Sequence, residues 1–115
     1  MQTTLWHNPR CSKSRQTLEL LKAQGITPSI RLYLQDPPSQ SELATVLKAL
    51  DFNPRQLIRT KESEYKELGL QSPTLSDNAL LEAMVSHPRL IERPVVLHGE
   101  RAAVGRPPEN VLEIL

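Results

Sequence analysis

The residue of this 115-residue chain best suited to chemistry is its single cysteine, Cys11. It stands in a polar, cationic run, His7-Asn8-Pro9-Arg10-Cys11-Ser12-Lys13-Ser14-Arg15, between a short apolar stretch and a helical pattern. We therefore expect the thiol at a helix start, where unpaired N–H groups and the positive end of the helix dipole favour the thiolate and lower the pKa. The alternative is an inert cysteine that packs as a small hydrophobe, and the basic neighbours argue against it.

The elements around this cysteine read as strand, loop and helix. Residues 3–7 are β-branched and aromatic, and the strand they predict stops at Pro9, which lacks an N–H. Leucines at helical spacing predict a helix over residues 12–24, ended by Gly25 in the left-handed conformation. Residues 30–34 predict a second strand, so the two strands form a parallel pair.

The rest of the chain predicts helices followed by a hairpin. Serine caps, proline stops and the Gly99-Glu100 turn mark the boundaries. The expected elements are a helix from Ser39 or Ser41 to Leu50, short helices over 53–73, a helix from Ser76 or Asp77 to His87, strands over 94–98 and 101–105, and a closing helix over 107–115.

This order predicts an α/β fold of the thioredoxin-like class, with a four-stranded mixed sheet flanked by helices. A helical insertion would separate strand two from strand three, and residues 1–115 would form a single domain. In that topology a proline before the third strand of the sheet faces the cysteine, often through a cis peptide, and Pro94 stands there. An ordinary proline at the start of a strand is the alternative.

Composition limits the partners of the chain. With 14 Lys and Arg against 13 Asp and Glu, the net charge is +1, so no global field attracts nucleic acid or a membrane, and any anion site must be local. Nine arginines against five lysines favour guanidinium groups for such a site. We expect a cytoplasmic protein, because the first residues lack a signal-peptide pattern and no apolar run is long enough to span a membrane. His87 and His98 lack ligand-spaced neighbours, so no metal site is expected.

Four separated motifs of this sequence occur in the order found in a known family. They are His7-Asn8-Pro9-x-Cys11-x-x-Ser14-Arg15, Leu57-Ile58-Arg59, Ile91-Glu92-Arg93-Pro94-Val95-Val96 and Gly105-Arg106-Pro107-Pro108-Glu109. From end to end the chain resembles the glutaredoxin- and glutathione-coupled arsenate reductase family (ArsC-like), which includes housekeeping members.

The resemblance assigns roles to individual residues. It implies that Cys11 is the nucleophile that attacks arsenate and that Arg59, Arg93 and Arg106 bind the oxyanion. The supporting residues would be His7, Asn8, Ser14, Arg15 and Pro94. Of these, His7 would tune the thiol or simply bond the backbone, and Ser14 would bond the thiolate or satisfy an N–H of the first helical turn.

The resemblance also implies the partners of the reaction. Glutathione would be a co-substrate and glutaredoxin the protein that recycles the enzyme, with no tightly bound cofactor. Because the chain has no second cysteine, an internal disulfide cannot form and an external thiol is needed. We expect a monomer, since the chain must dock a glutaredoxin.

Two rival functions fit the same fold. The first is a glutathione-dependent thiol-disulfide reductase, which the basic residues Arg10 and Lys13 favour if they hold glutathione carboxylates. The second is an Spx-type regulator that binds RNA polymerase. That function predicts a cysteine pair as a redox switch, whereas Ser14 occupies the second position here.

Overall fold

The computed structural model describes residues 2–115, which fall into two compact units. The first unit consists of the chain up to Asp36 together with Arg93–Leu115, and the second unit is Pro37–Glu92. The second unit is therefore an insertion in the sequence of the first. It is helical, as predicted, while all four strands belong to the first unit. That the chain forms a single domain stays a prediction.

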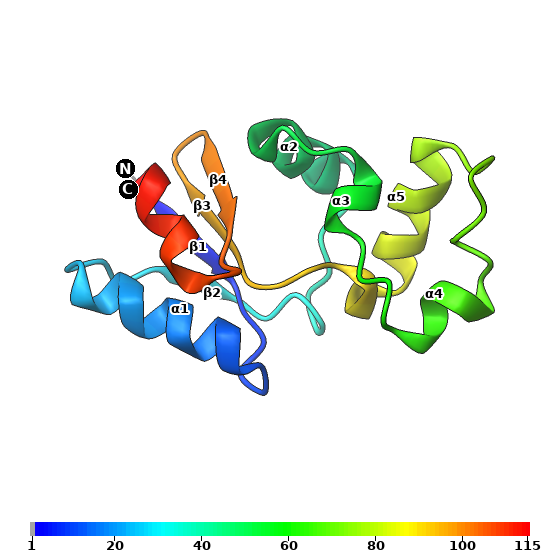
Figure 1. Ribbon diagram of the computed structural model, residues 1–115. Helices are drawn as coiled ribbons and strands as arrows, with labels where there is room; N and C mark the ends of the chain where they lie inside the picture. The colour runs from blue at the N-terminus through cyan, green and yellow to red at the C-terminus, as the bar shows by residue number, and fades with distance from the viewer. Residues whose placement is uncertain (1) are drawn as a thin grey trace. The chain divides into compact units, whose positions relative to one another are not determined.

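The first unit is built on a four-stranded mixed sheet, as predicted (Figure 1). Its strands lie in the order β2-β1-β3-β4. Strand β1 runs parallel to β2 and antiparallel to β3, and β4 completes a hairpin with β3. The strands are β1 (Thr3–Trp6), β2 (Ser29–Arg31), β3 (Val95–His98) and β4 (Arg101–Val104).

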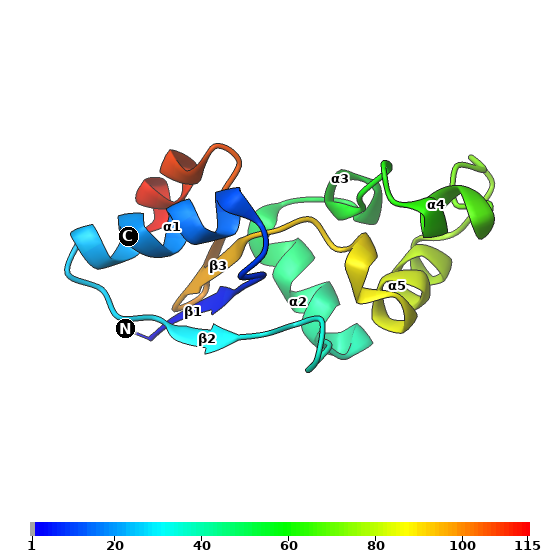
Figure 2. The same ribbon diagram turned by 90° about the horizontal axis from the view of Figure 1, so that it is seen from below.

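Two helices cover one face of this sheet, as both ribbon views show (Figures 1 and 2). They are α1 (Ser12–Ala23) and the closing helix η2 (Pro108–Ile114), which is a 3-10 helix. Their apolar side chains meet those of β1 and β3 in a core made of Leu5, Leu21, Val96, Val111 and Ile114. Helix α1 ends as predicted, because Gly25 follows it with φ +77°.

Local side-chain bonds set three of the helix starts in the second unit. Ser39 and Glu42 form a reciprocal capping box, Asn53 and Gln56 form another, and Ser76 accepts the N–H of Ala79. Helices α2 and α5 contact each other, and their residues Leu43, Val46, Leu47, Leu80 and Met84 are buried. The helices are α2 (Gln40–Leu50), α3 (Pro54–Leu57), α4 (Ser63–Glu67), α5 (Asp77–Ser86) and η1 (Pro88–Leu90).

The end of the second strand differs from the sequence prediction. Residues 30–34 were expected to be extended, but β2 stops at Arg31. The carbonyl of Leu32 accepts the N–H groups of Gln35 and Asp36 at 3.0 and 2.9 Å, which closes a turn where the pattern of apolar residues continues. Among the described residues, no helix has both the length and the apolar character needed to cross a membrane.

Candidate active site

Cys11 lies at the start of α1, as its sequence context predicts. It is the N-cap residue, with extended backbone angles, and its N–H donates to the carbonyl of Asn8 at 2.9 Å. Its own carbonyl accepts the N–H of Arg15 at 3.0 Å, so the residue belongs to the first turn. The thiol is buried, with 8% of the residue exposed. Backbone N–H groups of Lys13 and Ser14 are directed at its sulfur.

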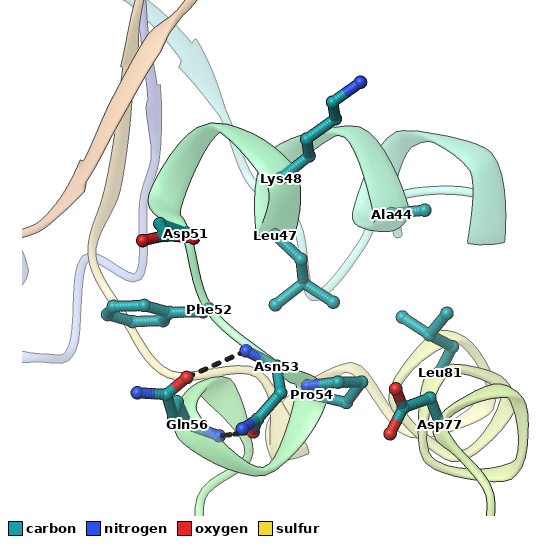
Figure 3. Close-up of a pocket in the computed structure, with 10 residues that line it drawn as sticks. All are labelled: Ala44, Leu47, Lys48, Asp51, Phe52, Asn53, Pro54, Gln56, Asp77 and Leu81. Atoms are coloured by element: carbon teal, nitrogen blue, oxygen red, sulfur yellow. Dashed lines mark hydrogen bonds between the residues drawn. The ribbon is translucent and has the colours of Figure 1, made fainter.

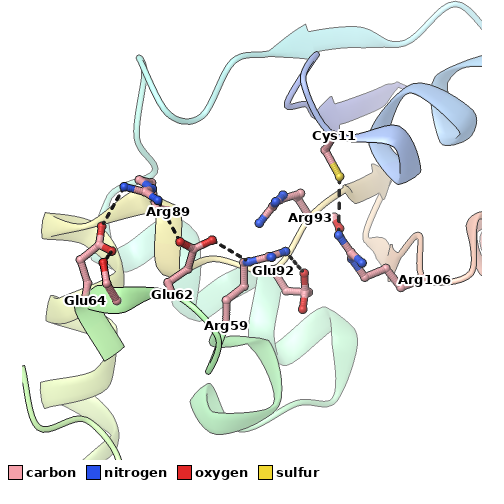
Figure 4. A network of polar contacts seen from close by, with 9 residues as sticks. Cys11, Arg59, Glu62, Glu64, Arg89, Glu92, Arg93 and Arg106 are labelled. Atoms are coloured by element: carbon pink, nitrogen blue, oxygen red, sulfur yellow. Dashed lines mark hydrogen bonds and ion pairs between the residues drawn. The ribbon is translucent and has the colours of Figure 1, made fainter. Parts of the chain in front are cut away.

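Two arginines of the first unit act on the same sulfur, and Figure 4 shows the contact of one of them, Arg106. Arg106 Nη2 lies 3.5 Å from Cys11 Sγ, and its Nε donates to the carbonyl of Arg93 at 2.7 Å. The side chain of Arg93 also hydrogen-bonds the sulfur, and its charge acts on it. The Arg93-Pro94 peptide is cis, and so is Arg106-Pro107. Arg93 and Arg106, which are 82 and 95 positions from Cys11 in the sequence, thus both lie close to its thiol.

The pKa of Cys11 lies below its ordinary value because several donors outweigh burial. Burial is the largest single influence and raises the pKa, since it disfavours the charged thiolate. The N–H of Ser14, the hydrogen bond and charge of Arg93, and the N–H of Lys13 all lower it. The combined effect favours a thiolate beside two guanidiniums, an environment suited to attack on an anionic electrophile.

A buried pair of side chains shapes the loop before Cys11. His7 Nδ1 and Ser14 Oγ lie 2.6 Å apart, and Ser14 Oγ also accepts the N–H of Asn8 at 3.0 Å. Burial, followed by the charge of Arg15, lowers the pKa of His7 and favours the neutral ring. A neutral ring whose Nδ1 accepts the Ser14 proton satisfies both groups. The hydroxyl of Ser14 is therefore engaged with the loop, and its backbone N–H is the group directed at Cys11.

Arg15 and Asn8 hold the outer part of the same loop. Arg15 Nη1 donates to the carbonyl of Pro9 at 2.8 Å, and Asn8 Oδ1 accepts the N–H of Arg10 at 3.0 Å. Both bonds span the segment just before the helix, so they fix the approach of the chain to Cys11. Both side chains thus act on the backbone of the loop.

Arg59 belongs to the second unit, where two carboxylates hold it (Figure 4). Its Nη1 lies 2.8 Å from Glu92 Oε1, and its Nε lies 3.2 Å from Glu62 Oε1. Glu62 also pairs with Arg89 at 3.0 Å. The backbone is fixed as well, since the Arg59 N–H donates to the carbonyl of Leu90 at 2.7 Å. Glu92 stands in one of the sequence motifs, but the motifs do not indicate that it or Glu62 pairs with Arg59.

The first unit also contains two buried residues next to Pro94 for which the sequence predicts no role, Thr17 and Gly105. The only signal in the sequence was the position of Gly105, directly before Arg106. Thr17 carried no signal, because a threonine inside an amphipathic helix is unremarkable in a single sequence.

A separate hollow lies in the second unit, between α2, α3 and α5 (Figure 3). Lys48, Phe52, Asn53 and Asp77 are among the residues that line it, and it contains none of the site residues predicted from the sequence. In the described part of the chain, no group of three or more His, Cys, Asp or Glu side chains is arranged to hold a metal ion.

Comparison with known proteins identifies the family of this chain. The model of the ArsC family matches residues 6–114, which include Cys11 and both arginines that reach it. The chain belongs to the ArsC family. One relative is the arsenate reductase of Haemophilus influenzae, which is 50% identical over the full length of both chains. YfgD of Escherichia coli K12 is 51% identical, over 99% of this chain and 97% of its own.

Solved structures place the ArsC-family chain in the thioredoxin-like class that was predicted. The arsenate reductase of Vibrio cholerae superposes with a TM-score of 0.97, at 52% identity over 100% of this chain and 98% of its own. A protein named YFFB, only 18% identical, still gives a TM-score of 0.82 over 97% of both chains, so the fold extends beyond close relatives.

Proposed function

We propose that this protein is an arsenate reductase in which the Cys11 thiolate attacks arsenate and glutathione and glutaredoxin supply the electrons. The observation that carries the proposal is the 3.5 Å approach of Arg106 Nη2 to Cys11 Sγ at the N-terminus of α1. Relatives named arsenate reductase at 50% and 48% identity, each over at least 96% of both chains, support the same reaction. Because this reaction reduces arsenic(V) to arsenic(III), the proposed enzyme is an oxidoreductase.

The first step proposed is attack by the thiolate on arsenic. Arsenate carries between one and two negative charges near neutral pH, so a thiolate approaches it only where cations offset the repulsion. Arg93 and Arg106 supply two guanidiniums at the sulfur, and the N-terminus of α1 adds its N–H groups. An S–As bond forms, and one arsenate oxygen leaves as water after protonation.

The second step transfers the electrons. A glutathione thiolate attacks Cys11 Sγ, so that an S–S bond forms while the electron pair of the S–As bond stays on arsenic. Arsenic(V) thereby becomes arsenic(III) and leaves as arsenite. A glutaredoxin thiolate then attacks the glutathione sulfur and regenerates the Cys11 thiolate. The chain has no second cysteine to do this internally.

Arg59 is the third arginine that we propose to bind the oxyanion. This assignment comes from the family motif Leu57-Ile58-Arg59. Its ion pairs with Glu62 and Glu92 partly neutralise its charge. An oxyanion that binds Arg59 must therefore compete with two carboxylates, which would make Arg59 a weaker anion ligand than a guanidinium without acidic partners.

The test is arsenite production from arsenate by purified protein with glutathione and glutaredoxin. We expect turnover by the wild type, loss of it in Cys11→Ser, and loss when either glutathione or glutaredoxin is omitted. A parallel assay offers a glutathione mixed disulfide as substrate. Activity on the mixed disulfide with no arsenite formed would overturn the proposal in favour of a glutathione-dependent thiol-disulfide reductase.

A further inference from the structure

The end of β4 lies unusually close to helix α1 and to the loop before β3. A Cβ atom built on Gly105 would lie 2.5 Å from Thr17 Oγ1 and 2.8 Å from Pro94 Cγ, both shorter than real Cβ contacts. The Gly105 N–H donates to the carbonyl of Pro94 at 2.9 Å. Helix α1 and the two ends of the β3-β4 hairpin therefore meet at this glycine, with no space for a side chain.

Each of these segments also carries a group that reaches Cys11. Arg106, the neighbour of Gly105, places its Nη2 at Cys11 Sγ and its Nε on the carbonyl of Arg93. Arg93, the neighbour of Pro94, hydrogen-bonds the same sulfur. Thr17 Oγ1 donates to the carbonyl of Lys13 at 2.8 Å, within the helical turn whose N–H groups face the sulfur.

We propose that Gly105 and Thr17 are positioning residues. The close packing of Gly105 against Thr17 and Pro94 sets the position of the Arg106 guanidinium at Cys11. The proposal rests on the arsenate reductase function for its substrate. The contacts that support it, however, involve only the groups around the Cys11 thiol. Neither residue touches the sulfur; each acts through Arg106 or through the first turns of α1.

The need for glycine here is steric and not conformational. Gly25, Gly69 and Gly99 have φ between +61° and +77°, the left-handed region, but Gly105 does not. Alanine at position 105 is therefore acceptable to the backbone and unacceptable only to its neighbours. Because cores are close-packed, the added methyl group must push β4 away from α1, and Arg106 moves with it.

The first variant is Gly105→Ala, and the main readout is the rate of Cys11 alkylation by iodoacetamide as a function of pH. A guanidinium that retreats from the sulfur stabilises the thiolate less, so the midpoint should rise by about half a pH unit or more. With arsenate, glutathione and glutaredoxin, kcat/KM should fall by about tenfold or more, since small displacements of catalytic groups are costly.

Gly25→Ala is the matched control. Gly25 follows the same helix, has nothing within 4 Å of its Cβ position, and needs glycine only for its φ of +77°. This variant should lose stability while the alkylation midpoint stays at the wild-type value. The comparison separates a general loss of stability from a displaced guanidinium.

Thr17→Ala supplies a rescue and a second test. It removes the oxygen that would lie 2.5 Å from the new methyl group, so Thr17→Ala combined with Gly105→Ala should recover part of the lost kcat/KM and bring the midpoint back toward the wild type. If Gly105→Ala does not fold, Thr17→Ala alone carries the test. It loosens the contact from the other side and should raise the midpoint by a smaller amount.

The outcomes separate this proposal from the proposed function. An unchanged alkylation midpoint in folded Gly105→Ala, or in Thr17→Ala where only that variant folds, overturns the positioning role whatever happens to arsenate. A raised midpoint in a protein that never reduces arsenate supports the positioning role and overturns the reductase function instead.

Discussion

The ionisation of Cys11 is a competition between burial and hydrogen-bond donors. Burial disfavours the thiolate more than any single donor favours it, yet the N–H groups of Ser14 and Lys13 and the guanidinium of Arg93 together prevail. No single donor suffices, so the low pKa of Cys11 depends on several donors acting together.

The first prediction concerns this pKa directly. Alkylation of Cys11 by iodoacetamide should show a midpoint below the ordinary value of about 8.5. Arg93→Gln should raise that midpoint, because it removes both a hydrogen bond and a charge that favour the thiolate. Arg10→Gln, at an exposed position on the preceding loop, is the control and should shift it less. A wild-type midpoint at or above the ordinary value would contradict the assignment.

The same shift predicts how stability depends on pH. The folded pKa of Cys11 lies below the unfolded value, so the thiolate contributes stability that is fully present above the unfolded pKa and lost as pH falls through the folded pKa. The unfolding free energy of the wild type, minus that of Cys11→Ser, should therefore increase with pH across this window and then level off. Urea titrations of both proteins at several pH values measure it.

Ser14 gives a prediction that separates its side chain from its backbone. Ser14→Ala removes the hydroxyl shared by His7 and the Asn8 N–H and leaves both without that partner, at a cost of about 1–3 kcal/mol in unfolding free energy. The backbone N–H at Cys11 remains, so the alkylation midpoint should change little. Ser12→Ala, at an exposed position, should alter neither quantity. A large rise of the midpoint in Ser14→Ala would show that the hydroxyl acts on the thiol.

Glu92 offers a test of Arg59 as an anion ligand. Glu92→Gln keeps an oxygen that accepts from Arg59 Nη1 and removes the competing negative charge. The KM for arsenate should fall by about threefold, which corresponds to the ~0.6 kcal/mol typical of a partly exposed ion pair. Glu64→Gln, which alters a pair with Arg89 at 3.7 Å, should leave KM unchanged. An unchanged KM in Glu92→Gln would remove Arg59 from the proposed oxyanion site.

At the scale of elements, local chemistry explains which boundaries were predictable. The starts of α2 and α5 follow from the side chains of Ser39 and Ser76, and the end of α1 follows from Gly25. These signals are read within four residues, so one sequence suffices. The prediction for the end of β2 was wrong because the carbonyl of Leu32 accepts hydrogen bonds within a turn, and the apolar residues of 30–34 do not reveal that turn.

The capping box of α2 makes the next prediction. Ser39→Ala removes the acceptor for the Glu42 N–H and leaves that donor to water, at a cost of about 1 kcal/mol. The melting temperature should fall by about 4 °C for a chain of this size. Ser41→Ala, two residues into the same helix and exposed, is the control and should have a much smaller effect. Equal losses in the two variants would contradict the role of the cap.

At the scale of the whole molecule, the charges nearly cancel. A net charge of +1 provides no long-range field, so the proposed oxyanion binding would depend on guanidiniums close to the sulfur. The kcat/KM for arsenate should therefore change by less than about threefold between ~0.01 and ~0.15 M salt, although the screening length falls from ~30 to ~8 Å. A tenfold or greater decrease in steady-state assays would indicate steering by distant charges.

The site was less predictable than the fold for a physical reason. Arg93 and Arg106 each lie more than 80 residues from Cys11 in the sequence, and only the ordered motifs of a family linked them to it in advance. Contacts such as Glu92 with Arg59, or Gly105 with Thr17, depend on packing distances that periodicity and capping do not encode. The sequence singled out Cys11 as the candidate nucleophile and, through the family motifs, Arg93 and Arg106 as its partners; the structure brings both arginines to its sulfur.

Trp6 is an intrinsic fluorescence probe of the first unit. It is the single tryptophan of the chain, it is 2% exposed, and the guanidinium of Arg31 lies 5.8 Å from its ring centroid. Its fluorescence therefore reports on β1, the strand that leads into the cysteine loop, while the helical insertion contains no tryptophan. Unfolding followed by tryptophan emission and by circular dichroism would then coincide only if the sheet and the inserted helices melt as one cooperative unit.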